Sequence, residues 1–168
     1  MSLLHSYHQS AKIVQRWPSE RRLLLSHLCL RIQDAERKLN AAAAMRLEGC
    51  LKDCRGLCCR NLQLDAVFGI PDFVYILASM PALDAKIEEC LRHKDPFFTS
   101  NCPFLDRGVG PCIFPPDLRP EVCITSFCRG DGAIKAEIRR VKIDFWKLGV
   151  LLHFRKVPLV HRLLAKSG

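Results

Sequence analysis

The stretch LLLSHLCLRIQDAERKLNAA, residues 23–42, predicts a long amphipathic helix. Its apolar side chains recur at alternating steps of three and four residues, as one face of a helix requires. They are Leu25, Leu28, Ile32, Ala35, Leu39 and Ala42. Ser19 is of the residue type that caps helices and stands shortly before the stretch. The helix is expected to run almost directly into Cys50.

A second helix is predicted after residue 133. Apolar residues again follow helical spacing, at Ile134, Ile138, Val141, Phe145 and Leu148. Pro158 should break or kink this helix. Its main use is expected to be packing against the first long helix. Its aromatic, leucine and basic content would also suit a membrane-surface or partner helix.

Two short helices are predicted between the long ones. Pro71 and Pro81 each stand where a first helical position tolerates a missing N–H, and Asp72 and Asp84 follow where the helix dipole favours acids. The fold class is therefore mainly α, and 168 residues suit one compact unit. It divides into an N-terminal helical extension (1–49), a loop-rich cysteine module (50–132) and a basic C-terminal helical segment (133–168).

The cysteine content indicates that the thiols have a chemical role. The chain has ten cysteines, an N-terminus unlike a secretory signal, and no apolar run long enough to span a membrane. We therefore expect a cytoplasmic protein. Because reductants keep most thiols there reduced, metal ligands or reactive thiols are expected rather than disulfides.

The run CLKDCRGLCCR, residues 50–60, holds four cysteines: Cys50, Cys54, Cys58 and Cys59. In a straight helix Cys50 and Cys58 would lie about 12 Å apart, whereas two thiolates on one zinc are less than about 4 Å apart. The chain must fold back, and Gly56 is placed to allow it. The adjacent pair Cys58-Cys59 fits two neighbouring metals, or a cluster with one thiol to spare.

Four more cysteines follow in a segment rich in proline and glycine: Cys102, Cys112, Cys123 and Cys128. A short hairpin is expected to turn at DRGVG, residues 106–110. A segment with so little helical pattern can be ordered by binding a metal. Thiolate ligands admit zinc, an iron–sulfur cluster or copper(I), and ligand type does not choose among them.

The motifs CLKDCRGLCCR, CPFLDRGVGPC and RPEVCITSFC, in this order, resemble the YkgJ-type cysteine-cluster family. The resemblance covers residues 50–128. It implies that the eight cysteines named above chelate zinc or iron, and it does not include Cys29 or Cys90. Flagellin lysine methylases carry a similar cluster, so the resemblance also admits a redox or protein-modifying enzyme.

Other candidates stand outside the cluster. Cys29 is expected to be buried and His27 exposed, while Cys90 and His93 share a helical face and could bind metal. Arg119 could offset thiolate charge or donate hydrogen bonds around the cysteines.

The charge is uneven along the chain. Residues 61–132 hold six basic and ten acidic side chains, whereas residues 133–168 hold nine basic and two acidic ones. The basic C-terminal segment suits an acidic protein partner or an anionic membrane surface. A nucleic-acid adaptor is a weaker alternative, because no recognition motif accompanies the basic ends.

Overall fold

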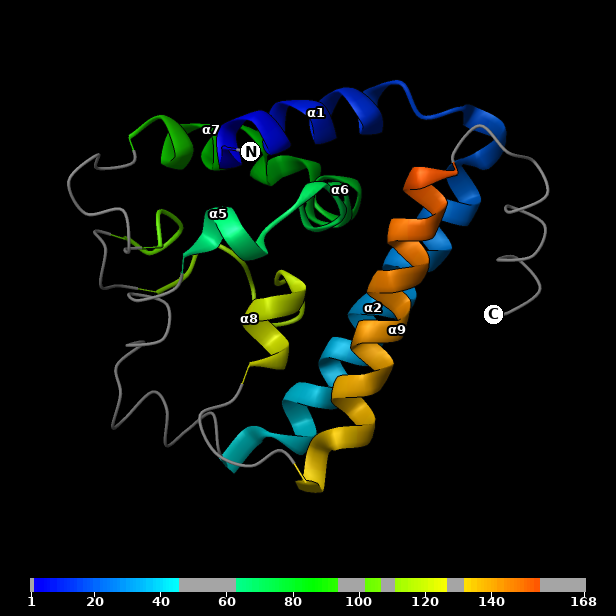
Figure 1. The fold of residues 1–168 in the computed structure, drawn as a ribbon, viewed down its shortest axis with the longest axis vertical. Coiled ribbons are helices and arrows are strands. Elements are labelled where there is room, and N and C mark those ends of the chain that lie inside the picture. Colours follow the sequence, from blue (N-terminus) through cyan, green and yellow to red (C-terminus); the bar gives the residue numbers. More distant parts are fainter. Residues whose placement is uncertain (1, 46–62, 94–101, 107–110, 127–131, 155–168) are drawn as a thin grey trace.

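The computed structural model describes residues 2–45, 63–93, 102–106, 111–126 and 132–154. This part of the chain is mainly α-helical, as predicted, and contains no strand beyond one isolated bridge (Figure 1). The helices are α1 (Leu3–Gln15), α2 (Arg22–Ala42), α5 (Leu64–Val67), α6 (Ile70–Ser79), α7 (Asp84–Arg92), α8 (Glu121–Thr125) and α9 (Lys135–His153), with 3-10 turns η1 (Ser19–Arg21), η3 (Pro81–Leu83) and η5 (Gly132–Ile134).

The two long helices α2 and α9 lie side by side and antiparallel (Figure 1). The predicted apolar stripe of α9 is buried throughout, and that of α2 is buried with one exception. The exception is Ala42, which is exposed, while Ala43 is buried just past the end of the helix. Packing between these helices confirms the main use predicted for the second one.

Helix α6 lies at the centre of the fold and contacts α1, α2 and α9. Every side chain from Asp72 to Leu77 is buried, which is typical of a helix surrounded by others. The prolines mark the starts of helical segments as predicted, because Pro71 lies in the first turn of α6 and Pro81 begins η3.

Helix α1 was not predicted. Its buried face consists of Leu3, Ser6, Tyr7 and Ser10, so serines occupy half of the positions where apolar residues would have revealed the pattern. Ser10 is accommodated because its hydroxyl donates to the carbonyl of Ser6 at 2.7 Å and is 3.2 Å from that of Ile70. The cap expected at Ser19 is also wrong, since Ser19 begins η1 and α2 starts at Arg22.

One hydrophobic core joins residues from all three predicted segments, from Leu3 and Ile32 through Phe73 and Phe104 to Leu151. Within the described ranges, no helix has the length and apolar character needed to cross a bilayer.

Candidate metal centre

The structure describes three of the eight predicted metal-binding cysteines, Cys102, Cys112 and Cys123. Cys102 is buried, and the other two are half-buried. The remaining predictions, Cys50, Cys54, Cys58, Cys59 and Cys128, lie outside the described residues.

Cys102 and Cys112 belong to two backbone segments that pair with each other. Cys112 forms an isolated antiparallel bridge with Leu105, and the N–H of Ile113 donates to the carbonyl of Phe104 at 2.9 Å. The N–H of Leu105 in turn donates to the carbonyl of Cys102 at 3.3 Å. Both cysteines are therefore held next to the same residue, which agrees with the hairpin predicted here. Its turn, residues 107–110, is outside the described part.

Aromatic packing fixes this pair of segments to the helical core. Phe104 is almost fully buried, and its ring centroid lies 5.7 Å from that of Phe68 and 4.8 Å from that of Phe114. Phe68 in turn meets Phe73 of α6 edge-on at 4.4 Å. Edge-on and tilted ring pairs are favourable in addition to the burial of their apolar surface. Cys102 and Cys112 thus each lie two residues before a phenylalanine that anchors their segment.

Cys123 is positioned by a different contact. It lies in the short helix α8, whose first N–H, that of Glu121, donates to Oδ1 of Asp72 at 3.0 Å. The other oxygen of Asp72 accepts the N–H of Gly69 at 2.9 Å. Burial raises the pKa of Asp72 to about 6, although both hydrogen bonds favour the ionised form. The Asp72 side chain therefore ties the start of α8 to the start of α6.

A buried carboxyl group fixes the segment that precedes α8. Glu36 of α2 has no solvent exposure, and its Oε2 accepts the backbone N–H of Arg119 at 3.1 Å. Its Oε1 has no hydrogen-bond partner among the described residues. Burial raises the pKa of Glu36 to about 8, opposed by the Arg119 hydrogen bond. Near neutral pH much of this carboxyl is therefore protonated.

Arg119, predicted to act on the thiolates, has a described position beside Glu36. Its side chain is half-buried, and its Nε has no hydrogen-bond partner among the residues described. The charge of the guanidinium lowers the pKa of Glu36, but less than burial raises it. Arg119 contacts α2 through its backbone N–H. Its predicted effect on the thiolates stays a prediction.

Across the described residues, no three His, Cys, Asp or Glu side chains gather into a group that could hold a metal ion. Cys102, Cys112 and Cys123 do not complete a site on their own. A centre with three or more such ligands that uses them therefore needs at least one donor from outside the described ranges.

The cysteines outside the predicted cluster have different surroundings. Cys29 is buried, as predicted, and burial raises the pKa of its thiol to about 12. Its thiol therefore stays protonated and is a poor candidate for a ligand. The Cys90 thiol also has a raised pKa through burial. His93 directly follows the last residue of α7, and its imidazole Nδ1 lies 2.8 Å from the carbonyl oxygen of Glu89.

The anchoring residues Glu36, Phe104 and Phe114 were not identified from the sequence. For Glu36 a signal was present, because it stands four residues after Ile32 and three before Leu39, within the apolar stripe. A charged residue at such a position is a candidate for a buried polar contact. Phe104 and Phe114 each lie two residues from a cysteine, where only the fold reveals what they pack against.

Comparison with family models, with curated proteins and with solved structures found no match to this chain.

Proposed function

We propose that this protein binds zinc or iron, the latter as an ion or an iron–sulfur cluster, through cysteines from two segments of the chain. The first segment contributes from Cys50, Cys54, Cys58 and Cys59, and the second from Cys102, Cys112, Cys123 and Cys128. Ten cysteines in 168 residues, eight of them in ordered motifs that resemble a metal-chelating family, support this function.

The observation that carries the proposal is the anchoring of the second segment. Phe104 and Phe114 fix the residues around Cys102 and Cys112 to the core, and Asp72 fixes the helix that contains Cys123. A metal site benefits from ligands held in place before the metal arrives, because less chain must be ordered on binding. In this proposal, the cysteines of the first segment and Cys128 supply the donors that complete the site.

The test is metal content per chain, by elemental analysis, of protein purified under anaerobic and reducing conditions. Serine in place of Cys54, Cys58, Cys102 or Cys123 should lower bound metal, because a hydroxyl is a much poorer ligand than a thiolate. Cys90→Ser and Cys29→Ala are the matched controls and should retain the wild-type metal content. Circular dichroism of each variant separates loss of a ligand from loss of the helical core.

The absorption spectrum then separates the metals. Broad visible absorption together with iron and sulfide would indicate a cluster, and a colourless protein with zinc would indicate zinc. Full metal occupancy in variants from both segments would refute the proposal. So would a wild-type protein that contains no metal but stoichiometric disulfides.

A further inference from the structure

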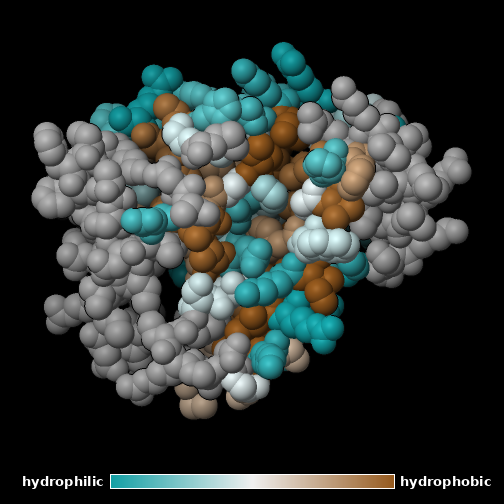
Figure 2. Space-filling view, viewed as in Figure 1, coloured by the Kyte–Doolittle hydropathy of each residue, from teal (hydrophilic) through white to brown (hydrophobic). Residues whose placement is uncertain are grey.

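Two adjoining hollows form a groove along α9, on the face seen in Figure 2. Their volumes are about 450 and 510 Å³, and both are lined by Pro71, Gly149 and His153. One extends towards α1, where Lys12 and Ile13 line it, and the other towards α8. Volumes of this size fall in the range of pockets for small organic ligands, which is about 300–1,000 Å³.

Gly149 lies where the two hollows meet, in the interior of a helix of 19 residues. Glycine in a helix interior is less stabilising than alanine, because its backbone loses more conformational freedom on folding. A Cβ atom built at Gly149 would meet nothing within 4 Å, so packing of the described residues does not require the glycine. Its effect is to leave the backbone of α9 bare at the floor of the groove.

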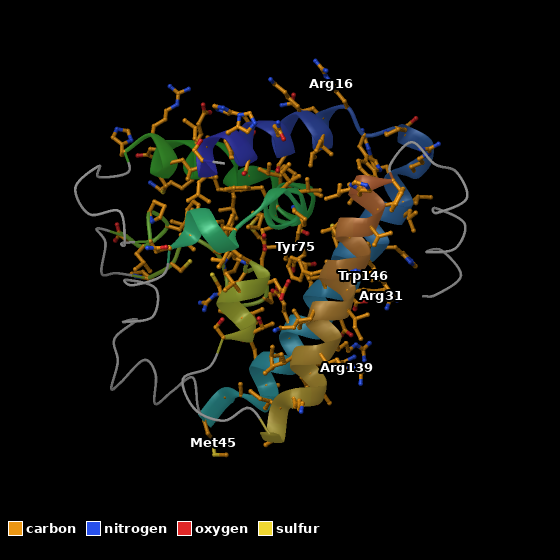
Figure 3. The ribbon with its side chains drawn as sticks, viewed as in Figure 1. Arg16, Arg31, Met45, Tyr75, Arg139 and Trp146 are labelled. Atoms are coloured by element: carbon orange, nitrogen blue, oxygen red, sulfur yellow. The ribbon has the colours of Figure 1, made fainter. Side chains whose placement is uncertain are left out.

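The groove combines apolar walls with an exposed aromatic ring. Phe145, Trp146 and Val150 of α9 line the part next to α8. Trp146 is 67% exposed, and Figure 3 shows it on the open face of α9. An indole ring so exposed offers a flat apolar surface for an aromatic or aliphatic group.

Basic side chains stand at both ends of the groove. Lys12 on α1 and Lys142 on α9 are exposed, and neither lies within ion-pair distance of a carboxylate among the described residues. The two carboxyl groups in the lining, those of Asp72 and Glu121, are less available to a ligand than the two lysines are. Asp72 is buried and accepts two backbone N–H groups, and Glu121 is half-buried with Lys142 close enough to affect its charge.

We propose that this groove binds a small amphipathic organic anion. The apolar part of the ligand would lie over Gly149 against Trp146, and its carboxylate, sulfonate or phosphate would lie near Lys12 or Lys142. The apolar lining, the bare helix backbone and the two lysines, which form no ion pair with the part of the chain that the structure describes, together favour this class. A cationic ligand would meet the positive charges of Lys12 and Lys142.

The probes are 8-anilinonaphthalene-1-sulfonate, whose fluorescence rises in apolar sites, and decanoate as a competitor. With the full chain, we expect saturable probe binding that decanoate displaces and that decanol, its uncharged counterpart, displaces much less. Gly149→Leu should abolish binding by filling the groove, while the melting temperature stays the same or rises through better helix propensity. Ala136→Leu, at an exposed position of the same helix outside the lining, is its control.

The charge requirement is tested separately. Lys12→Gln and Lys142→Gln should each weaken decanoate binding about two- to fivefold, the range expected for an exposed charge pair. Lys135→Gln, also exposed on α9 but outside the groove, should have no effect. Unchanged probe binding in folded Gly149→Leu, or equal displacement by decanol and decanoate, would overturn the proposal. So would a wild-type dimer that dissociates in Gly149→Leu, because the groove would then bind a second copy.

Discussion

One carboxylate oxygen of Asp72 accepts the backbone N–H of Glu121 at 3.0 Å, across 49 residues of sequence. The other oxygen accepts the N–H of Gly69, the residue that precedes α6, and α6 is the helix that contains Asp72. A single side chain therefore satisfies the first backbone donors of two helices, one of which contains Cys123. This makes Asp72 the point at which the helical core and the cysteine-bearing segment are joined.

Replacement of Asp72 by alanine should lower the free energy of unfolding by about 1 to 3 kcal/mol, because two N–H groups lose their buried acceptor. Asp72→Asn keeps one acceptor oxygen and should lose less. Urea unfolding followed by circular dichroism measures both. Asp34→Ala, which removes an exposed carboxylate, is the control and should change little. Equal stability of Asp72→Ala and wild type would contradict the assigned contact.

Glu36 should make the protein less stable as the pH rises. Its pKa is about 8 when folded and about 4.5 as an unperturbed group. Between these values the folded chain binds more protons than the unfolded chain, so the stability falls with increasing pH. Glu36→Gln resembles the protonated acid and can still accept the N–H of Arg119 through its amide oxygen.

The measurement for Glu36 is the melting temperature of Glu36→Gln and wild type at pH 5 and at pH 8.5. The two proteins should be similar in stability at pH 5, and the variant should be the more stable at pH 8.5, by an amount on the order of a few kcal/mol. Comparing the variant with wild type at each pH cancels the titration of all other groups. A difference that does not depend on pH would show that Glu36 is ionised throughout.

The ion pair between Arg31 and Asp144 should contribute to the pairing of α2 with α9. The Nη2 of Arg31 lies 2.8 Å from Oδ1 of Asp144, whose side chain is only 2% exposed. Arg31→Met would leave a buried carboxylate without this partner, at a cost of about 3 kcal/mol, the low end for a buried pair because Arg31 is 32% exposed. Because replacing both members with apolar residues removes that penalty, Arg31→Met combined with Asp144→Leu should recover part of the loss.

Denaturant unfolding of the two single variants and the double variant gives the coupling between Arg31 and Asp144. Lys38→Met, which breaks the exposed Lys38–Asp34 pair on the same helix, should cost no more than about 0.5 kcal/mol. Simple additivity of the Arg31 and Asp144 substitutions would mean that the pair contributes nothing.

Removal of residues 155–168 should weaken binding to vesicles that contain phosphatidylserine. The deletion removes four basic residues, Arg155, Lys156, Arg162 and Lys166, each of which contributes about 1 kcal/mol near an anionic surface. The deletion should begin after Phe154, because Leu151 and Leu152 belong to the core. Vesicle co-sedimentation at low and high salt measures the effect.

A full-length variant with glutamine at the same four positions separates charge from chain length. It should bind these vesicles as weakly as the shortened chain does. Wild-type binding by either variant would argue against the C-terminal segment as the membrane contact and would leave the alternative of an acidic protein partner to test.

The helices that follow a local repeat could be predicted, and those that depend on distant partners could not. Leu25, Ile32 and Leu39 mark the buried face of α2 because spacing along one helix is enough to define it. Helix α1 escaped prediction because Ser6 and Ser10 are buried, and Ser10 relies in part on a carbonyl 60 residues away. The cysteines of the candidate centre could be identified from their motifs. The residues that anchor them, such as Phe104 and Asp72, could not.

Residue type and spacing were sufficient to establish the mainly α class, the buried faces of α2 and α9, and the helix starts near Pro71 and Pro81. These features depend on interactions within a few residues, which the order of amino acids states directly. The contacts Glu36–Arg119, Asp72–Glu121 and Phe104–Phe68 join residues 36 to 83 positions apart. The sequence around one member of such a pair does not specify the other member. The partner is determined by how the helices pack and by which buried polar groups need a hydrogen bond in that packing.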